Sequence, residues 1–227
     1  MKHLTVASIA FASVLVAGQA FAGPLIDQSA GLKLFLGADV WTAPSNVPPG
    51  VTGPLDGSGA GFGYGGAAYY ELRLIKLVGI EADLAYQHGP FHRTVTTNGV
   101  DTTYTLTTNS WRLPILAKLN IPLGLGRFWL GLGPEFTLAS SSSVKTEAGG
   151  ASVTQSGVTR DVKPVFGTGG LGLVIEIPLT GIEIPLEFRA SKNLSQPSNF
   201  SDRFDATTVR AESSWVFRLG AGVGYQF

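Results

Sequence analysis

WVFRLGAGVGYQF, residues 215–227, alternates apolar side chains with small or polar ones. The odd-numbered positions carry only apolar residues, whereas the even-numbered positions hold a valine, an arginine, three glycines and a glutamine. A period of two is that of a β-strand, in which successive side chains point to opposite faces of the sheet. We therefore interpret the C-terminal segment as a strand with one wholly apolar face.

Seven other segments show the same alternation, and each is long enough to cross a bilayer, for which about 9–11 tilted residues suffice. These segments are Gly31–Thr42, Ala60–Lys76, Gly79–His88, one that ends at Leu119, Arg127–Ala139, one that ends at Glu176, and Ile182–Ser191. Short connections alternate with long polar ones, and the short ones are Leu77-Val78, Asn120–Gly126 and Pro178–Gly181. This alternation is typical of outer-membrane barrels, which have tight periplasmic turns and long outer loops. The sequence predicts an all-β fold: a closed antiparallel up-and-down transmembrane β-barrel of eight strands, with long extracellular loops and short periplasmic turns.

The N-terminus has the pattern of an export signal. Lys2 and His3 precede the apolar stretch Leu4–Val16, and Ala20-Phe21-Ala22 is a small-x-small cleavage pattern. The apolar stretch is too short for a membrane anchor, so residues 1–22 are interpreted as a cleaved signal peptide. Residues 23–227 form the barrel domain, expected in a bacterial outer membrane with both mature ends in the periplasm.

Composition excludes several classes of function. The chain contains no cysteine, which rules out thiol catalysis and cysteine-ligated metal. Its 16 basic and 16 acidic residues balance, so no overall field attracts nucleic acid. We expect no cofactor-binding and no metal site.

Charged residues collect on the face that the pattern assigns to the barrel interior. An eight-stranded barrel is only wide enough for side chains to fill it, and unpaired buried charge is strongly unfavourable. The favoured interpretation is an internal salt-bridge network that plugs the lumen, and the alternative is a narrow selective pore. The residues assigned to this network are Lys33, Asp39, Glu71, Arg73, Glu81, Asp83, Arg112, Lys118, Glu135, Glu176, Glu183, Glu187, Arg189 and Arg218.

Two further residue types are informative within the strands. Prolines 114, 134 and 185 each remove a ladder donor, so we place them at bulges or strand ends. Aromatic residues near strand ends predict two girdles at the membrane interfaces. The residues assigned to the girdles are Trp41, Tyr86, Trp111, Phe166, Phe188 and Trp215 at loop ends, with Phe128, Tyr225 and Phe227 at turn ends.

The second and third long connections contain hairpin signals. Asn98-Gly99 lies between β-prone residues, which is a strong signal for a two-residue turn, and Gly149-Gly150 repeats it more weakly. The flanking strands are therefore expected to continue above the membrane as protruding ribbons. Such ribbons expose edges that can add a strand from an extracellular partner, although a solvated extension without a partner explains them equally well.

Evidence for catalysis is weak. After removal of the signal peptide, His88 and His92 are the only histidines, and neither has a serine and a carboxylate beside it in the sequence. Ser140–Ser143 would have to approach them across the barrel. No catalytic residue is assigned, and a non-enzymatic role is favoured.

Three stretches resemble the outer-membrane β-barrel domain family, which includes OmpX-, OmpA- and PorT-type proteins. They are Leu113–Leu119, Phe128–Pro134 and the terminal Tyr225-Gln226-Phe227. The resemblance implies a small outer-membrane barrel, and Tyr225 and Phe227 resemble the aromatic-ended last strand that the barrel assembly machinery recognises. Members of the family are structural, adhesive or transport-related.

Three functions therefore remain open. The first is a non-enzymatic surface role in membrane integrity, adhesion or interaction through protruding loops. The second is a narrow channel or conduit for small or hydrophobic molecules, and the third is a lipid-modifying enzyme. Expected partners are outer-membrane lipid, the assembly machinery and an extracellular partner at the loops, with no nucleic acid, and the barrel is expected to be a monomer.

Overall fold

The computed structural model describes residues 26–42, 59–158, 164–195 and 212–227. The predicted signal peptide and most of the first outer loop lie outside these ranges. Within them, no helix is long and apolar enough to span a membrane. The strands are β1 (Ile26–Thr42), β2 (Gly59–Leu74), β3 (Val78–Thr97), β4 (Val100–Leu123), β5 (Gly126–Ala148), β6 (Ala151–Val158), β7 (Val165–Glu176), β8 (Ile182–Asn193) and β9 (Glu212–Gln226).

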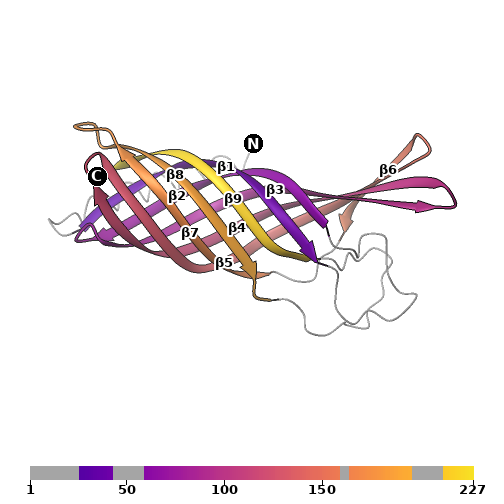
Figure 1. The fold of residues 1–227 in the computed structure, drawn as a ribbon, viewed down its shortest axis with the longest axis horizontal. Helices are drawn as coiled ribbons and strands as arrows, with labels where there is room; N and C mark the ends of the chain where they lie inside the picture. Colours follow the sequence, from indigo (N-terminus) through magenta and orange to yellow (C-terminus); the bar gives the residue numbers. More distant parts are fainter. Residues whose placement is uncertain (1–25, 43–58, 159–163, 196–211) are drawn as a thin grey trace.

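Eight of these strands form a closed antiparallel ring. Neighbours in the chain pair with each other, β5 pairs with both β4 and β7, and β1 pairs with β9 to close the sheet. Among the described strands, β6 alone stands outside the ring, and its partner there is β5. Figure 1 shows the tilted strands around one axis, with the C-terminus at the same end as the short turns. The prediction of an eight-stranded up-and-down barrel is confirmed.

The turns between strands lie at slightly different positions from those that the sequence suggested. Strand β4 continues to Leu123, so the predicted turn Asn120–Gly126 shrinks to two residues before β5 begins. The first turn lies at 75–77 rather than at Leu77-Val78, and both Ile75 and Lys76 have positive φ. A β-branched residue rarely adopts that conformation, which is why the sequence did not indicate a turn there.

The three prolines correct a prediction, because each lies inside a strand rather than at a bulge or an end. Pro114 keeps its partner Glu135 on β5, while the β3–β4 ladder skips two pairs beside it. Pro134 and Pro185 likewise keep their ladders with β7 and interrupt those with β4 and β9, respectively. A strand in a closed ring has two neighbours, so one intact ladder holds it where the missing N–H weakens the other.

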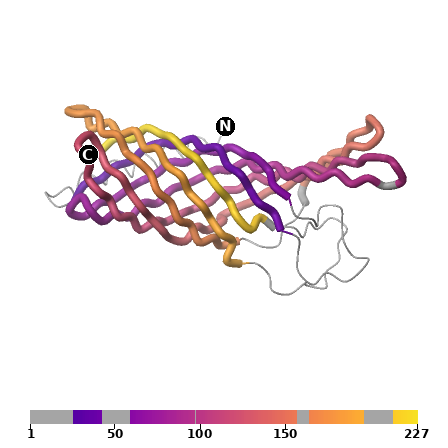
Figure 2. Tube along the Cα trace, viewed as in Figure 1, coloured from indigo at the N-terminus to yellow at the C-terminus, as the bar shows by residue number. Residues whose placement is uncertain are grey.

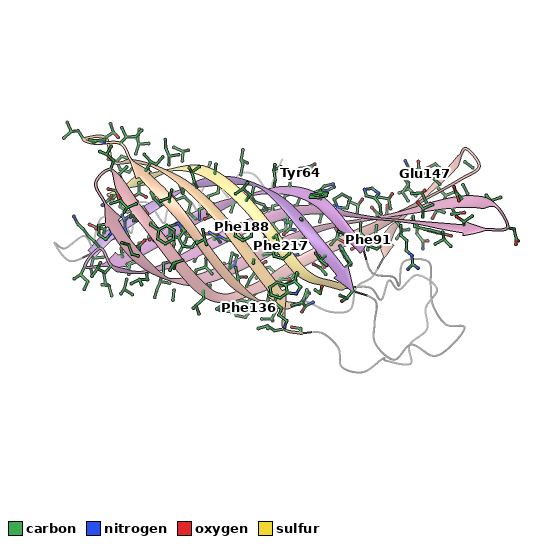
Figure 3. All side chains as sticks on the ribbon, viewed as in Figure 1. Tyr64, Phe91, Phe136, Glu147, Phe188 and Phe217 are labelled. Atoms are coloured by element: carbon green, nitrogen blue, oxygen red, sulfur yellow. The ribbon has the colours of Figure 1, made fainter. Side chains whose placement is uncertain are left out.

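The outer wall of the ring is apolar, as expected for contact with lipid. Leu34, Leu36, Leu132 and Leu219 are each at least 65% exposed, which would be costly in water and is favourable in hydrocarbon. Figure 3 shows Phe188 and Phe217 on this wall, where their rings stack with centroids 6.4 Å apart. Two aromatic residues assigned to the girdles, Trp41 and Phe166, do not lie on the outer wall, because their side chains are buried inside the barrel.

Strands β3, β4, β5 and β6 extend beyond the barrel as a ribbon (Figure 2). The hairpin turns lie at Asn98-Gly99 and Gly149-Gly150, and all four residues have positive φ. Positive φ at both central residues is the geometry that asparagine and glycine adopt at low cost, so the sequence signal for both hairpins is confirmed.

Candidate functional site

The barrel interior is filled with charged side chains. All fourteen residues assigned to the lumen network point inward, and thirteen of them are at most 8% exposed. The exception is Glu176, whose side chain is 41% exposed at the end with the short turns. The ion pairs form three clusters along the barrel axis, called here the turn-end, middle and loop-end clusters.

The turn-end cluster centres on Arg127, at the start of β5. Its guanidinium group donates to Glu183 at 2.8 and 3.1 Å, to Glu176 at 2.8 Å and to Glu71 at 3.3 Å. Arg73 adds a second bond to Glu183 at 3.2 Å. Arg127 was not assigned to the lumen network from the sequence. The predicted strand begins at Arg127, but its inward-facing residues were assigned only from Gly131 onward. The same alternation, carried four residues back, identifies it.

The middle cluster joins opposite walls. Arg189 on β8 donates to Asp83 and Glu81 on β3, both at 2.6 Å, and β3 and β8 are four strands apart in either direction around the ring. Lys33 on β1 contacts Glu81 at 2.8 Å and Glu187 at 3.0 Å. These contacts bridge opposite walls of the lumen at this level.

Lys118 links the turn-end cluster to the middle one. Its ammonium group lies 3.2 Å from Glu71 and 2.8 Å from Glu81, and 4.1 Å from the centroid of the Trp129 ring. Trp129 is fully buried. It was not assigned to the interior from the sequence because, like Arg127, it is an odd-numbered residue that precedes Gly131. The indole fits because Gly172 faces it: a Cβ there would lie 2.6 Å from Trp129 Nε1.

The loop-end cluster is built around Glu135, which is fully buried. Arg218 donates to it at 2.5 and 3.0 Å, and Arg112 at 2.9 Å. The hydroxyls of Thr168 and Ser191 donate to the same carboxylate at 2.9 and 3.0 Å. The remaining acid, Asp39, accepts a hydrogen bond from Gln87 at 2.9 Å, and Gln87 in turn accepts one from Arg218 at 3.2 Å. Asp39 is therefore linked to the loop-end cluster through a neutral side chain.

An apolar cluster lies beyond the loop-end cluster, where the ribbon leaves the barrel. Trp41, Phe91 and Leu106 are buried there and pack with Tyr104 and Val144. Figure 3 shows Phe91 at this end of the barrel. The lumen is therefore filled by ion pairs and covered at its loop end by hydrophobic side chains.

Some buried polar atoms of the described interior lack a hydrogen-bond partner. Both amide atoms of Asn120, the Tyr69 hydroxyl and Glu71 Oε1 belong to this group. All three residues lie in the turn-end half. Buried polar groups of this kind are ordinarily satisfied by internal water.

One hollow lies on the outer wall. It has a volume of about 640 Å³ and opens between outward-facing side chains of β1, β2, β8 and β9, including Leu34, Leu36, Leu186 and Leu219. Its lining is apolar, so within the membrane this hollow faces acyl chains.

The two histidines lie on the outer face of β3, outside the lumen. His88 Nδ1 is 2.7 Å from Asn109 Oδ1, and His92 Nδ1 is 3.0 Å from Thr105 Oγ1. Neither contact involves a carboxylate. Within the described residues, no group of three His, Asp or Glu side chains is arranged to hold a metal ion.

Solved structures with a similar fold include small barrels of bacterial outer membranes. The attachment invasion locus protein Ail of Yersinia pestis is 12% identical, with 88% of this chain and 99% of that chain covered and a TM-score of 0.38. Neisserial surface protein A is 10% identical, with 87% and 97% covered and a TM-score of 0.39. The outer-membrane protein OprG of Pseudomonas aeruginosa is 12% identical, with 89% and 95% covered and a TM-score of 0.40.

These likenesses concern the fold alone, because the identities are low. No protein-family model matches the sequence, and no curated protein matches it. The fold assignment rests on the closed ring of strands.

Proposed function

We propose that this chain is an integral outer-membrane barrel that does not conduct and that acts at the cell surface through its ribbon. The contact between Arg189 and the acids of β3 supports the first part, because it joins opposite walls of the lumen. The ribbon supports the second part, since it carries four strands beyond the apolar wall. The role is structural or adhesive and involves no catalysis.

The orientation follows from this proposal: the ribbon lies outside the cell and the short turns lie in the periplasm. The natural chain has no cysteine, so single cysteines report their own position. Val100→Cys and Ala151→Cys, beside the two hairpin tips, are expected to react with a membrane-impermeant maleimide on intact cells. Leu125→Cys, in the β4–β5 turn, should react only after the outer membrane is permeabilised. Labelling of Leu125→Cys on intact cells would reverse the orientation.

A closed lumen is the property that separates a surface barrel from a channel. In planar bilayers the purified protein is expected to show no steady open state, because the ion pairs of the three clusters fill the interior. A stable conductance in most insertions would instead favour the channel. Rare brief openings would leave the closed state as the resting form.

Within the ribbon, the two outer edges differ. Residues Ala151–Ser156 of β6 contain no charge and no proline, whereas the β3 edge beyond His88 carries Pro90 and Arg93. Charges and prolines are the usual means by which an exposed edge is kept from pairing with another strand. The β6 edge is therefore the better template for an added strand, which is the mode of contact proposed here.

Adding a charge to each edge tests this mode of contact. Thr154→Lys, on β6, is expected to lower retention of the protein on an immobilised octapeptide of alternating valine and threonine at least fivefold, because a lysine disfavours strand addition. Thr94→Lys, on the β3 edge, is the matched control and should change retention less than twofold. Equal losses in both variants, or no loss in either, would contradict strand addition at β6.

A further inference from the structure

The outward-facing side chains of β4 change character abruptly along the strand. Six consecutive outward positions are apolar, namely Leu113, Ile115, Ala117, Leu119, Ile121 and Leu123. At about 3.4 Å per residue and a tilt of roughly 40°, they span about 25 Å of membrane, the height of the apolar band in such barrels. Trp111 follows, and beyond it the outward positions are all polar: Asn109, Thr107, Thr105, Thr103 and Asp101. The membrane boundary on β4 therefore lies at Trp111.

This polar surface extends across all four strands of the ribbon, because residues that pair across strands share a face. We call it the hydroxyl face. Ten of its members are serine or threonine, and the proline in the same set is its one member without a polar side chain. The face comprises His88, Pro90, His92, Thr94 and Thr96 on β3; Asp101, Thr103, Thr105, Thr107 and Asn109 on β4; Ser141, Ser143, Lys145 and Glu147 on β5; and Ser152, Thr154 and Ser156 on β6.

The opposite face of the ribbon has a different composition. It continues the lumen side, and its base is the apolar cluster that contains Phe91 and Leu106. Farther out it carries Val95, Tyr104 and Val153. It also carries hydroxyls, such as those of Thr102, Thr108, Ser142 and Thr146, but mixes them with apolar side chains and with Arg93. The face that continues the lipid-facing wall differs in carrying no apolar side chain apart from Pro90.

The chemistry of the hydroxyl face suits an uncharged ligand. Lys145 is its one lysine or arginine, and the ammonium group lies 2.6 Å from Glu147, which neutralises it. Neighbouring hydroxyls are in register, as shown by the 3.1 Å bond between Thr94 and Thr103. Each hydroxyl both donates and accepts, which matches the hydroxyls of a saccharide and gives no preference for phosphate or sulfate.

Aromatic rings lie at the base of this face, on its membrane side. The rings of Tyr86 and Trp111 are 5.4 Å apart, and those of Tyr64 and His88 are 4.9 Å apart. Tyr64 is 58% exposed and Trp111 46% exposed, so both present ring surface to the exterior. The negative face of an aromatic ring attracts the weakly positive C–H edge of a sugar ring. Figure 3 shows Tyr64 on the barrel wall near the ribbon, and Glu147 on the ribbon itself.

We propose that the hydroxyl face, with Trp111 and Tyr64 at its base, binds the uncharged saccharide headgroup of a glycolipid in the surrounding leaflet. Continuity of the surface selects this ligand. A lipid whose acyl chains lie against Leu113 and Ile115 places its headgroup at Trp111, and a longer headgroup extends along Asn109, Thr107 and Thr105. The headgroup contacts proposed on β4 lie two strands away from the β6 edge, so they do not depend on strand addition.

The test compares two lipids with the same acyl chains. The mature protein is reconstituted in nanodiscs that contain phosphatidylcholine and a diacylglycerol carrying four uncharged hexoses, and the lipids retained after detergent extraction are counted by mass spectrometry. The wild-type protein is expected to retain the glycolipid at least tenfold over its share of the mixture. Retention in proportion to the mixture would overturn the proposal.

Matched variants locate the site. Thr103→Val with Thr105→Val removes two hydroxyls of the hydroxyl face at nearly constant shape, and should reduce the enrichment to less than twofold. Thr102→Val with Thr146→Val makes the same change on the opposite face of the ribbon and should leave enrichment unchanged. Trp111→Leu keeps an apolar side chain at the boundary and is expected to lower enrichment about threefold or more.

Three outcomes would contradict the proposal. Equal losses in the two double variants would show that the effect is not specific to the hydroxyl face. Undiminished enrichment in Thr103→Val with Thr105→Val would show that these hydroxyls do not bind the headgroup. Equal binding of the free tetrasaccharide, measured with the same protein, would remove the role of the lipid anchor. Because all the valine substitutions lie on the ribbon, heat-modified gel mobility of the barrel serves as the check on folding.

Discussion

Replacing Glu135 by glutamine is expected to destabilise the folded barrel by about 3–5 kcal/mol, the usual cost of removing one partner from a buried ion pair. The carboxylate is fully buried and accepts from two guanidinium groups and two hydroxyls. Both ion pairs described for Arg112 and Arg218 go to this residue. Glutamine keeps the shape but removes the negative charge that both guanidinium groups contact directly.

Urea titration of the protein folded in phospholipid vesicles, followed by tryptophan fluorescence, measures this loss. Glu147→Gln is the matched control, because it lies on the same strand and pairs only with the exposed Lys145. That pair is half in solvent, so its loss should change stability by no more than about 0.5 kcal/mol. A change below about 1 kcal/mol for Glu135→Gln would show that water enters the loop-end cluster and replaces the carboxylate.

Alternation in the sequence was enough to predict the barrel, because a side-chain period of two assigns each residue of a strand to the lumen or to lipid. Lys33, Glu81 and Arg189 could each be placed inward in this way. The partners of these residues could not be predicted, since contacts across a barrel depend on the stagger of strands around the ring. The pairing of Arg189 with Glu81 and Asp83 on the opposite wall is a consequence of that stagger.

Irregular positions explain most of what the sequence did not predict. Leu138 is an extra residue on β5, where the pairing shifts between Trp111 and Arg112. Beyond this bulge the odd-numbered residues of β5 change from the inner to the outer side, as Thr137 and Ser141 show. A one-residue insertion of this kind exchanges the inward and outward assignment of every later residue on β5, so the β5 part of the hydroxyl face could not be assigned from the sequence. The prediction of aromatic girdles was wrong for Trp41 and Phe166 for a simpler reason. Aromatic residues near strand ends can also fill the interior of the barrel.

The assignment of sides on β8 has a direct energetic consequence. Leu186 is 40% exposed on the outer wall, and its neighbours Leu173 on β7 and Ala221 on β9 share that face. Leu186→Arg is expected to cost roughly 2–4 kcal/mol near the midplane, because the charge would face hydrocarbon. Leu125→Arg, in the β4–β5 turn, is the control and should cost about 0–1 kcal/mol, as expected at an interface.

The adjacent substitution Glu187→Gln is expected to be milder than Leu186→Arg. Glu187 faces the lumen, and its partners have other anions: Lys33 keeps Glu81 at 2.8 Å, and Arg189 keeps Asp83 at 2.6 Å. The middle cluster therefore loses one of several acids, whereas the loop-end cluster would lose the carboxylate that both of its arginines contact. Folding titrations of Leu186→Arg and Glu187→Gln in the same vesicles establish the order. If Glu187→Gln were the more damaging, a one-residue slip in the register of β8 would be the first explanation, because such a slip exchanges the lumen and lipid faces of the whole strand.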